Sequence, residues 1–259
     1  MIGIFDSGVG GMTVARAVER LLPNYPICYL GDIARCPYGT KSSQTIIDYS
    51  IENTRFLIEH GARIIIIACN TASSVATEHL RKTFTIPIIE VISPAVCEAL
   101  KRTQSGRIGI IGTRATIRSN TYETTILGKR PDCKVVSTPC PLLVPLVEEG
   151  WLNKRETKMI LRRYLQPLKN QQIDTLVLGC THYPLLKNLI QPRIGKRIAL
   201  IDSSVTTAQY LHNSPYLDNI SLPGKITQNR FFVTDLTDSV QKIADKIFQR
   251  PLTLKRISL

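Results

Sequence analysis

Short, almost fully apolar runs alternate with amphipathic stretches along most of this chain. The run Ile64–Ile67 is apolar at every position, which is typical of a strand covered on both faces of a parallel sheet. Helical periodicity lies between such runs, and it predicts helices that follow strands. The alternation therefore predicts an α/β fold. We expect strands at residues 2–5, 27–30, 64–68, 88–91, 108–111, 134–137, 175–178, 198–201 and 231–234.

The chain contains an internal repeat of one sequence pattern. An apolar strand ends at Cys69, and a second one ends at Cys180, each followed by small polar residues. We expect two similar, doubly wound parallel-sheet domains related by pseudo-symmetry, the first made of residues 1–93 with 206–259 and the second of 94–205. Ligands of such folds bind beyond the carboxyl ends of the strands. The active site is therefore predicted in the cleft between the domains, with one thiol on each side.

Composition excludes several classes of protein. With 43% hydrophobic and 20% charged residues the chain can bury a core, which excludes whole-chain disorder. No apolar run approaches the roughly 20 residues of a membrane helix. The first residues show no signal peptide pattern, so we expect a cytoplasmic protein without membrane contact.

The net charge of +13 raises the question of nucleic-acid binding. The basic residues are dispersed, and aromatic residues do not interleave with them as a stacking platform requires. We interpret the charge as a basic solvated surface that would also attract a small dianion.

The seven cysteines have no CxxC spacing and the four histidines form no HxxxH or HExxH motif. In a chain of this length we expect free thiols, and no sequence signature indicates a metal site.

A glycine-rich loop spans residues 6–11 between the first strand and the first helix. It lacks the spacing of a dinucleotide fingerprint and the Lys-Ser/Thr of a phosphate-binding Walker loop. On this pattern a tight turn and an anion site remain equally open.

Cys69 and Cys180 carry the chemical hypothesis. A cysteine at the end of a buried strand is usually a small core residue. Here, however, the neighbours Asn70-Thr71 and Thr181-His182 place hydrogen-bonding groups beside each sulfur, and His182 can tune a thiol or pass a proton. The carboxylates of Asp6 and Glu148 lie on other loops that can reach the same cleft.

The residues resemble the cofactor-independent glutamate racemases. The resemblance covers nearly the whole chain and rests on GIFDSGVGG at 3–11, GDIARCPYGTKS at 31–42, ACNTAS at 68–73, PLVEEG at 145–150 and LGCTHYPLL at 178–186. The chain departs from the family pattern at Ile33, where Thr is common, and at Cys36, where the family usually has an apolar residue.

The resemblance implies a two-base mechanism without pyridoxal phosphate or any other cofactor. Cys69 would deprotonate D-glutamate and Cys180 would deprotonate L-glutamate. Asp6, His182 and Glu148 would assist the thiols. The implied substrate-binding residues are Asp6, Ser7, Tyr38, Gly39, Asn70, Thr71, Thr181 and His182, with Thr113 and Thr116 expected nearby.

The resemblance also implies a homodimer that supplies D-glutamate for peptidoglycan. Two alternatives remain. One is a racemase of the same family that acts on aspartate or another amino acid. The other is a non-catalytic basic protein on the same fold, which uses its basic surface on nucleic acid or a protein partner. Some family members are associated with DNA gyrase inhibition, which would be a second role.

Overall fold

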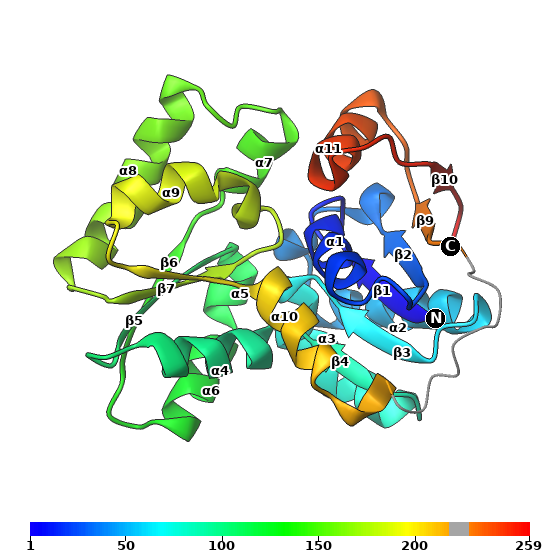
Figure 1. Cartoon of the computed structure of the whole chain (residues 1–259), viewed down its shortest axis with the longest axis horizontal. Coiled ribbons are helices and arrows are strands. Elements are labelled where there is room, and N and C mark those ends of the chain that lie inside the picture. Colours follow the sequence, from blue (N-terminus) through cyan, green and yellow to red (C-terminus); the bar gives the residue numbers. More distant parts are fainter. Residues whose placement is uncertain (218–227) are drawn as a thin grey trace.

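The computed structural model describes residues 1–217 and 228–259. In these ranges strands alternate with helices, and the strands build two separate parallel sheets (Figure 1). The predicted α/β fold with two parallel-sheet domains is therefore confirmed.

The first sheet has six strands in the order β10-β9-β2-β1-β3-β4, and all neighbours are parallel. Alternate residues face opposite sides, so that Ile4 and Ile66 enter one core while Phe5 and Ile67 enter another. Both faces are covered, as the apolar run predicts. The strands are β1 (Ile2–Asp6), β2 (Ile27–Gly31), β3 (Ile64–Ile67), β4 (Ile88–Glu90), β9 (Arg230–Val233) and β10 (Leu254–Arg256).

Helices cover both faces of this sheet. One face is packed by α1 (Met12–Leu21), α10 (Ser203–His212) and α11 (Asp238–Phe248). The other is packed by α2 (Ser43–Glu59) and α3 (Asn70–Thr83). Two short 3-10 helices, η1 (Ile33–Arg35) and η2 (Tyr38–Thr40), lie in the loop between β2 and α2.

The second sheet has four parallel strands in the order β6-β5-β7-β8. They are β5 (Arg107–Gly112), β6 (Lys134–Pro139), β7 (Thr175–Gly179) and β8 (Ala199–Asp202). One face is packed by α4 (Ile92–Arg102) and α6 (Thr121–Lys129), and the other by α7 (Leu143–Glu148), α8 (Arg155–Asn170) and α9 (Lys187–Ile194). The shorter elements are α5 (Arg114–Arg118), η3 (Tyr183–Leu186) and η4 (Pro215–Leu217). None of the described helices combines the length and apolar character needed to cross a lipid bilayer.

The two sheets repeat one arrangement. The order β2-β1-β3-β4 in the first sheet corresponds to β6-β5-β7-β8 in the second. Cys69 follows β3 and Cys180 follows β7, so the two cysteines occupy equivalent positions in the two halves. The internal repeat in the sequence thus reflects a repeated topology.

All nine predicted strands are present, and one further strand, β10, was not predicted. It carries two exposed basic residues, Lys255 and Arg256, and pairs only with β9 at the sheet edge. An edge strand buries little, so it leaves no apolar run in the sequence.

The chain passes between the sheets twice. It leaves β4 through α4, whose Ile92 and Ala95 pack in the core of the second sheet. It returns through α10, whose Ala208 and Leu211 pack in the core of the first sheet. The domain limits at 93/94 and 205/206 stay predictions, and residues 218–227, assigned to the first domain, lie outside the described residues.

Candidate active site

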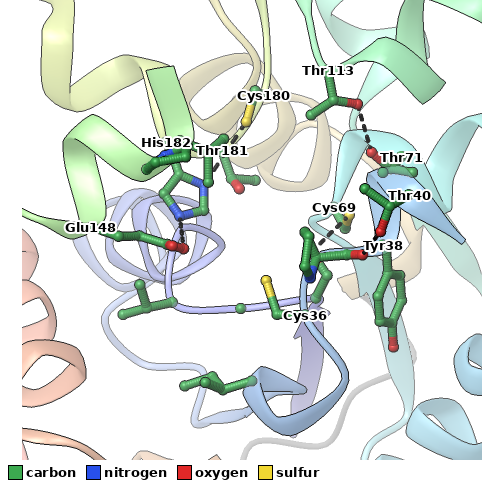
Figure 2. A pocket seen from close by; sticks show the side chains of 18 of the residues that line it. Cys36, Tyr38, Thr40, Cys69, Thr71, Thr113, Glu148, Cys180, Thr181 and His182 are labelled. Atoms are coloured by element: carbon green, nitrogen blue, oxygen red, sulfur yellow. Dashed lines mark hydrogen bonds and ion pairs between the residues drawn. The ribbon is translucent and has the colours of Figure 1, made fainter. Parts of the chain in front are cut away.

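A cavity of about 610 Å³ lies between loops at the carboxyl ends of strands from both sheets (Figure 2). Most predicted site residues line it, namely Ser7, Tyr38, Gly39, Cys69, Asn70, Thr71, Thr113, Glu148, Cys180, Thr181 and His182. Asp6 and Thr116 do not line the cavity and are buried behind its wall. The structure thus brings together residues from both halves of the chain.

Cys69 lies at the N-terminus of α3 and is 5% exposed. Its Sγ accepts a hydrogen bond from the Ala72 N–H at 3.5 Å and donates to Oγ of Ser7 at 3.4 Å. Burial and, to a smaller extent, the Asp6 carboxylate raise the pKa of the Cys69 thiol, hydrogen bonds with Ser7 and Ala72 offset part of the rise, and the resulting pKa is about 12. At neutral pH this thiol therefore holds its proton.

Asp6 ends β1 and organises the glycine-rich loop. Its Oδ2 accepts hydrogen bonds from the N–H groups of Gly8, at 3.2 Å, and Gly11, at 2.8 Å. The loop therefore binds its own carboxylate, which favours the tight-turn interpretation. Burial raises the pKa of Asp6, whereas nearby His182 and the backbone N–H groups lower it in part.

Cys180 follows the equivalent strand of the second domain, β7, and is also 5% exposed. Its Sγ lies 3.8 Å from Nδ1 of His182, and Nε2 of the same imidazole lies 3.0 Å from Oε1 of Glu148. Thiol, imidazole and carboxylate thus form one hydrogen-bonded chain. Figure 2 shows this chain on one side of the pocket and Cys69 on the other.

His182 is held in its charged form. Burial lowers the pKa of the imidazole, but the hydrogen bonds and charges of Cys180 and Glu148 outweigh burial and raise this pKa to about 10. The imidazole therefore carries its positive charge at neutral pH, next to the Cys180 sulfur.

Gly10 lets the two domains approach at this point. A Cβ atom on Gly10 would lie 2.5 Å from Cε1 of His182 and 2.6 Å from Oγ1 of Thr181. No side chain fits there, so the backbone of the glycine-rich loop packs directly against the imidazole of His182.

Hydrogen-bond donors surround the space between the thiols. Asn70 is 3% exposed, and its Nδ2 has no hydrogen-bond partner among the described residues. Thr71 Oγ1 lies 3.0 Å from Thr113 Oγ1 and 3.2 Å from Thr116 Oγ1, which joins the two domains through hydroxyls. A buried donor without a partner is costly, so the Asn70 amide indicates a place for a polar ligand atom.

The loop at residues 36–40 lines the cavity, and both Tyr38 and Gly39 take part. The Tyr38 side chain turns away from the cavity, where its hydroxyl binds the Asp32 carboxylate and accepts from Asn53 Nδ2 at 3.0 Å. A ligand in the cavity would therefore meet the part of Tyr38 and Gly39 that lines the wall, and not the phenol hydroxyl. Cys36 also lines the cavity, and burial raises the pKa of its thiol.

Sequence reasoning missed one wall of the cavity. It is formed by α7 and α11, and the lining residues there are Val144, Pro145, Thr237, Ser239, Val240 and Ile243. Ser239 Oγ donates to the Glu148 carbonyl at 2.9 Å, which joins the two helices. The only signal for this wall was the PLVEEG motif, because α11 looks like an ordinary amphipathic helix.

The described part of the chain shows no arrangement of side chains suited to a metal ion. In residues 1–217 and 228–259 no three His, Cys, Asp or Glu side chains are grouped to hold one. All seven cysteines are free thiols.

Comparison with known proteins assigns the chain to a class. The sequence model of the Asp/Glu/Hydantoin racemase family matches residues 12–211. The chain therefore belongs to this family and is an amino-acid racemase, an isomerase.

Relatives that match over nearly their full length indicate which members of the family the chain is most similar to. The glutamate racemase of Persephonella marina is 48% identical over 100% of this chain and 97% of its own length. Among solved structures, glutamate racemase RacE1 of Bacillus anthracis has a TM-score of 0.94 at 37% identity, covering 100% of this chain and 97% of the other. Glutamate racemase of Francisella tularensis, solved in complex with D-glutamate, has a TM-score of 0.91 at 36% identity and covers 99% of this chain and 97% of its own. The resemblance to the glutamate racemases is confirmed.

Proposed function

We propose that this enzyme interconverts L- and D-glutamate by a two-base mechanism in which Cys69 and Cys180 exchange protons with opposite faces of Cα. The observation that carries the proposal is the pair of buried thiols at equivalent positions on two sides of one cavity. The names of the relatives support glutamate as the substrate.

The proposed reaction is balanced without a redox step. In the L-to-D direction the Cys180 thiolate takes the Cα proton, and the C–H electron pair stays on the substrate as a carbanion. The Cys69 thiol then gives its proton to the opposite face of Cα and becomes a thiolate. The D-to-L direction exchanges the two roles. An acid and a base on opposite faces are what inversion of a stereocentre requires.

The neighbours of the thiols have assisting roles in the proposal. His182, held by Glu148, places a positive charge beside Cys180, whereas Asp6 places a carboxylate behind Cys69 and helps this thiol keep its proton.

A carbanion without an electron sink needs electrostatic stabilisation from fixed donors. We assign this to Asn70 and Thr71 at the first turn of α3 and to Thr181 beside Cys180, all of which line the cavity. Ser7 and the chain at Tyr38-Gly39 would complete the amino-acid site. Both thiols are nearly excluded from water, which strengthens these interactions.

The proposed cellular role is to supply D-glutamate for peptidoglycan in the cytoplasm, and the proposed assembly is a homodimer. Both follow from family resemblance rather than from a contact within the chain.

The test is exchange of the glutamate α-proton for deuterium in heavy water, followed by proton NMR without added cofactor. Loss of the α-proton signal together with loss of optical rotation is expected. Exchange with aspartate but not with glutamate would show that the enzyme is an aspartate racemase of the same family. If no amino acid of a panel exchanged its α-proton, the proposal would be contradicted and a binding protein would be favoured. Gel shifts with nucleic acid at low salt would then be the next measurement.

The raised pKa of His182 predicts a descending alkaline limb in the pH profile of kcat/KM. The positive charge is present below the pKa and is lost as pH rises through about 10, so activity falls there. Glu148→Gln removes one group that raises the pKa, and the limb should move to lower pH.

The pH profile is recorded between pH 7 and pH 11, with circular dichroism at each pH as the control for folding. An alkaline limb that stays in place in Glu148→Gln would contradict the role of the His182–Glu148 pair.

A further inference from the structure

We infer that Tyr122 is a positioning residue that fixes the Asn70 amide with its Nδ2 group toward the substrate. The inference rests on the proposed function and extends it to a residue that neither lines the cavity nor belongs to any of the recognised motifs.

Tyr122 reaches from one domain into the other. It lies in the first turn of α6 and is 2% exposed, with its ring among Ile126 and Val177 in the core of the second domain. Its hydroxyl donates a hydrogen bond of 2.6 Å to Oδ1 of Asn70, which begins α3 in the first domain. Burial raises the pKa of the Tyr122 phenol well above its ordinary value, so the hydroxyl remains a donor at every pH of interest.

This hydrogen bond determines which end of the amide is left without a partner. With Oδ1 bound to the phenol, Nδ2 is the free end, and it is the buried donor that lacks a partner among the described residues. The opposite orientation would leave both the phenol proton and the amide oxygen unpaired, which costs more than one unpaired group. The orientation that leaves Nδ2 free for a ligand is therefore favoured before any ligand arrives.

Two further contacts hold Tyr122 in place. The adjacent Thr121 donates from Oγ1 to the Ser74 carbonyl at 3.2 Å, one turn further along α3. The Tyr122 ring lies against Gly179, where a Cβ atom would come within 3.2 Å of Cε2. Gly179 immediately precedes Cys180, and Asn70 immediately follows Cys69. One side chain thus contacts the residue that precedes Cys180 and the side chain of the residue that follows Cys69.

The chemistry of Nδ2 suggests its ligand. A neutral N–H donor at the first turn of α3 suits an anionic oxygen, and a hydrogen bond to a carboxylate is stronger than one between neutral groups. An Asn70 amide turned the other way would present an oxygen to that carboxylate and repel it. We therefore assign the Asn70–Tyr122 pair to a carboxylate of the substrate.

The first experiment compares Tyr122→Phe with Tyr183→Phe. Tyr183 is equally buried, but its hydroxyl donates to the Cys140 carbonyl at 3.0 Å and does not contact Asn70. Tyr122→Phe should raise the KM for glutamate about tenfold, because the amide is free to turn. Tyr183→Phe should lose a similar amount of thermal stability and leave KM unchanged.

A double-mutant cycle tests whether Tyr122 acts through Asn70. In the Asn70→Ala background Tyr122→Phe should add no further loss of kcat/KM, whereas independent roles would give additive losses. Asn70→Asp provides a variant that leaves Tyr122 intact. It keeps an oxygen for the phenol but replaces the donor by a second oxygen, and should lower kcat/KM about a hundredfold or more.

The outcomes separate the two proposals. If the unmodified enzyme racemises glutamate while Tyr122→Phe matches Tyr183→Phe in KM, or if the cycle is additive, the positioning role is overturned and the proposed function stands. If Tyr122→Phe does not fold, full activity of Asn70→Asp would overturn the inference by itself. If the unmodified enzyme shows no exchange with glutamate, the proposed function fails and the inference fails with it.

Discussion

Replacing Cys69 or Cys180 with serine is expected to lower the rate of glutamate racemisation by roughly 10³-fold or more, because each removes one of the two proton-transfer groups. A serine hydroxyl is close to a thiol in size but is a far weaker acid, so it cannot serve as the base. The measurement is loss of optical rotation, with purified variants checked for folding by thermal denaturation.

The surviving thiol gives each variant a stereochemical signature. In Cys69→Ser, Cys180 can still take and return a proton on its own face of the substrate, so residual deuterium exchange is expected in L-glutamate without inversion. Cys180→Ser should show the opposite preference, for D-glutamate. Exchange of both enantiomers in either variant would contradict the assignment of the two faces.

Cys97→Ser is the matched control for these substitutions. Cys97 is exposed and lies outside the cavity between the domains, so its replacement removes a thiol without touching the site. It should retain full activity. A loss comparable to that of Cys69→Ser would show that the assay reports thiol loss in general.

Gly10→Ala is expected to lower kcat/KM by roughly 10²-fold, although it adds only a single methyl group and Gly10 does not itself line the cavity. The new Cβ would lie within 2.6 Å of Thr181 Oγ1 and still closer to the His182 ring, so the imidazole or the whole domain must move. The φ of Gly10 is not positive, and an alanine can adopt this backbone. The loss should therefore appear in activity more than in folding.

Gly128→Ala is the corresponding control. Gly128 lies in α6 with nothing within 4 Å of its Cβ position, and alanine there should stabilise the helix by up to about 1 kcal/mol without changing kcat/KM. If Gly10→Ala behaved in the same way, the close packing of His182 on the glycine-rich loop would have no part in activity.

The strand pattern and the cysteine positions were predictable because they depend on local sequence. Ile64–Ile67 is apolar at each position since both faces of β3 are buried, and the same holds for much of β7. Once the strands are placed, parallel-sheet geometry brings the residues that follow them to one edge. Cys69 and Cys180 could therefore be assigned to a cleft without knowledge of the structure.

The parts that were missed depend on how the domains meet. Val240 and Ile243 look like core positions of an amphipathic helix, and only the approach of α11 to α7 makes them part of the cavity wall. Tyr38 lines the cavity, but the turn of its phenol toward Asp32 is a contact that no spacing in the sequence indicates. Tyr122 carries no motif at all, since its importance arises from a hydrogen bond between domains.

The repeated topology places the two thiols symmetrically but surrounds them unequally, with a carboxylate behind Cys69 and an imidazole paired to a carboxylate beside Cys180. Mirror-image substrates have identical free energies in solution, so no such asymmetry can shift the final mixture away from equal amounts. For glutamate, kcat divided by KM must then be the same in both directions. The unequal surroundings can appear only as a paired change, in which the enantiomer that saturates the enzyme at lower concentration is also turned over more slowly.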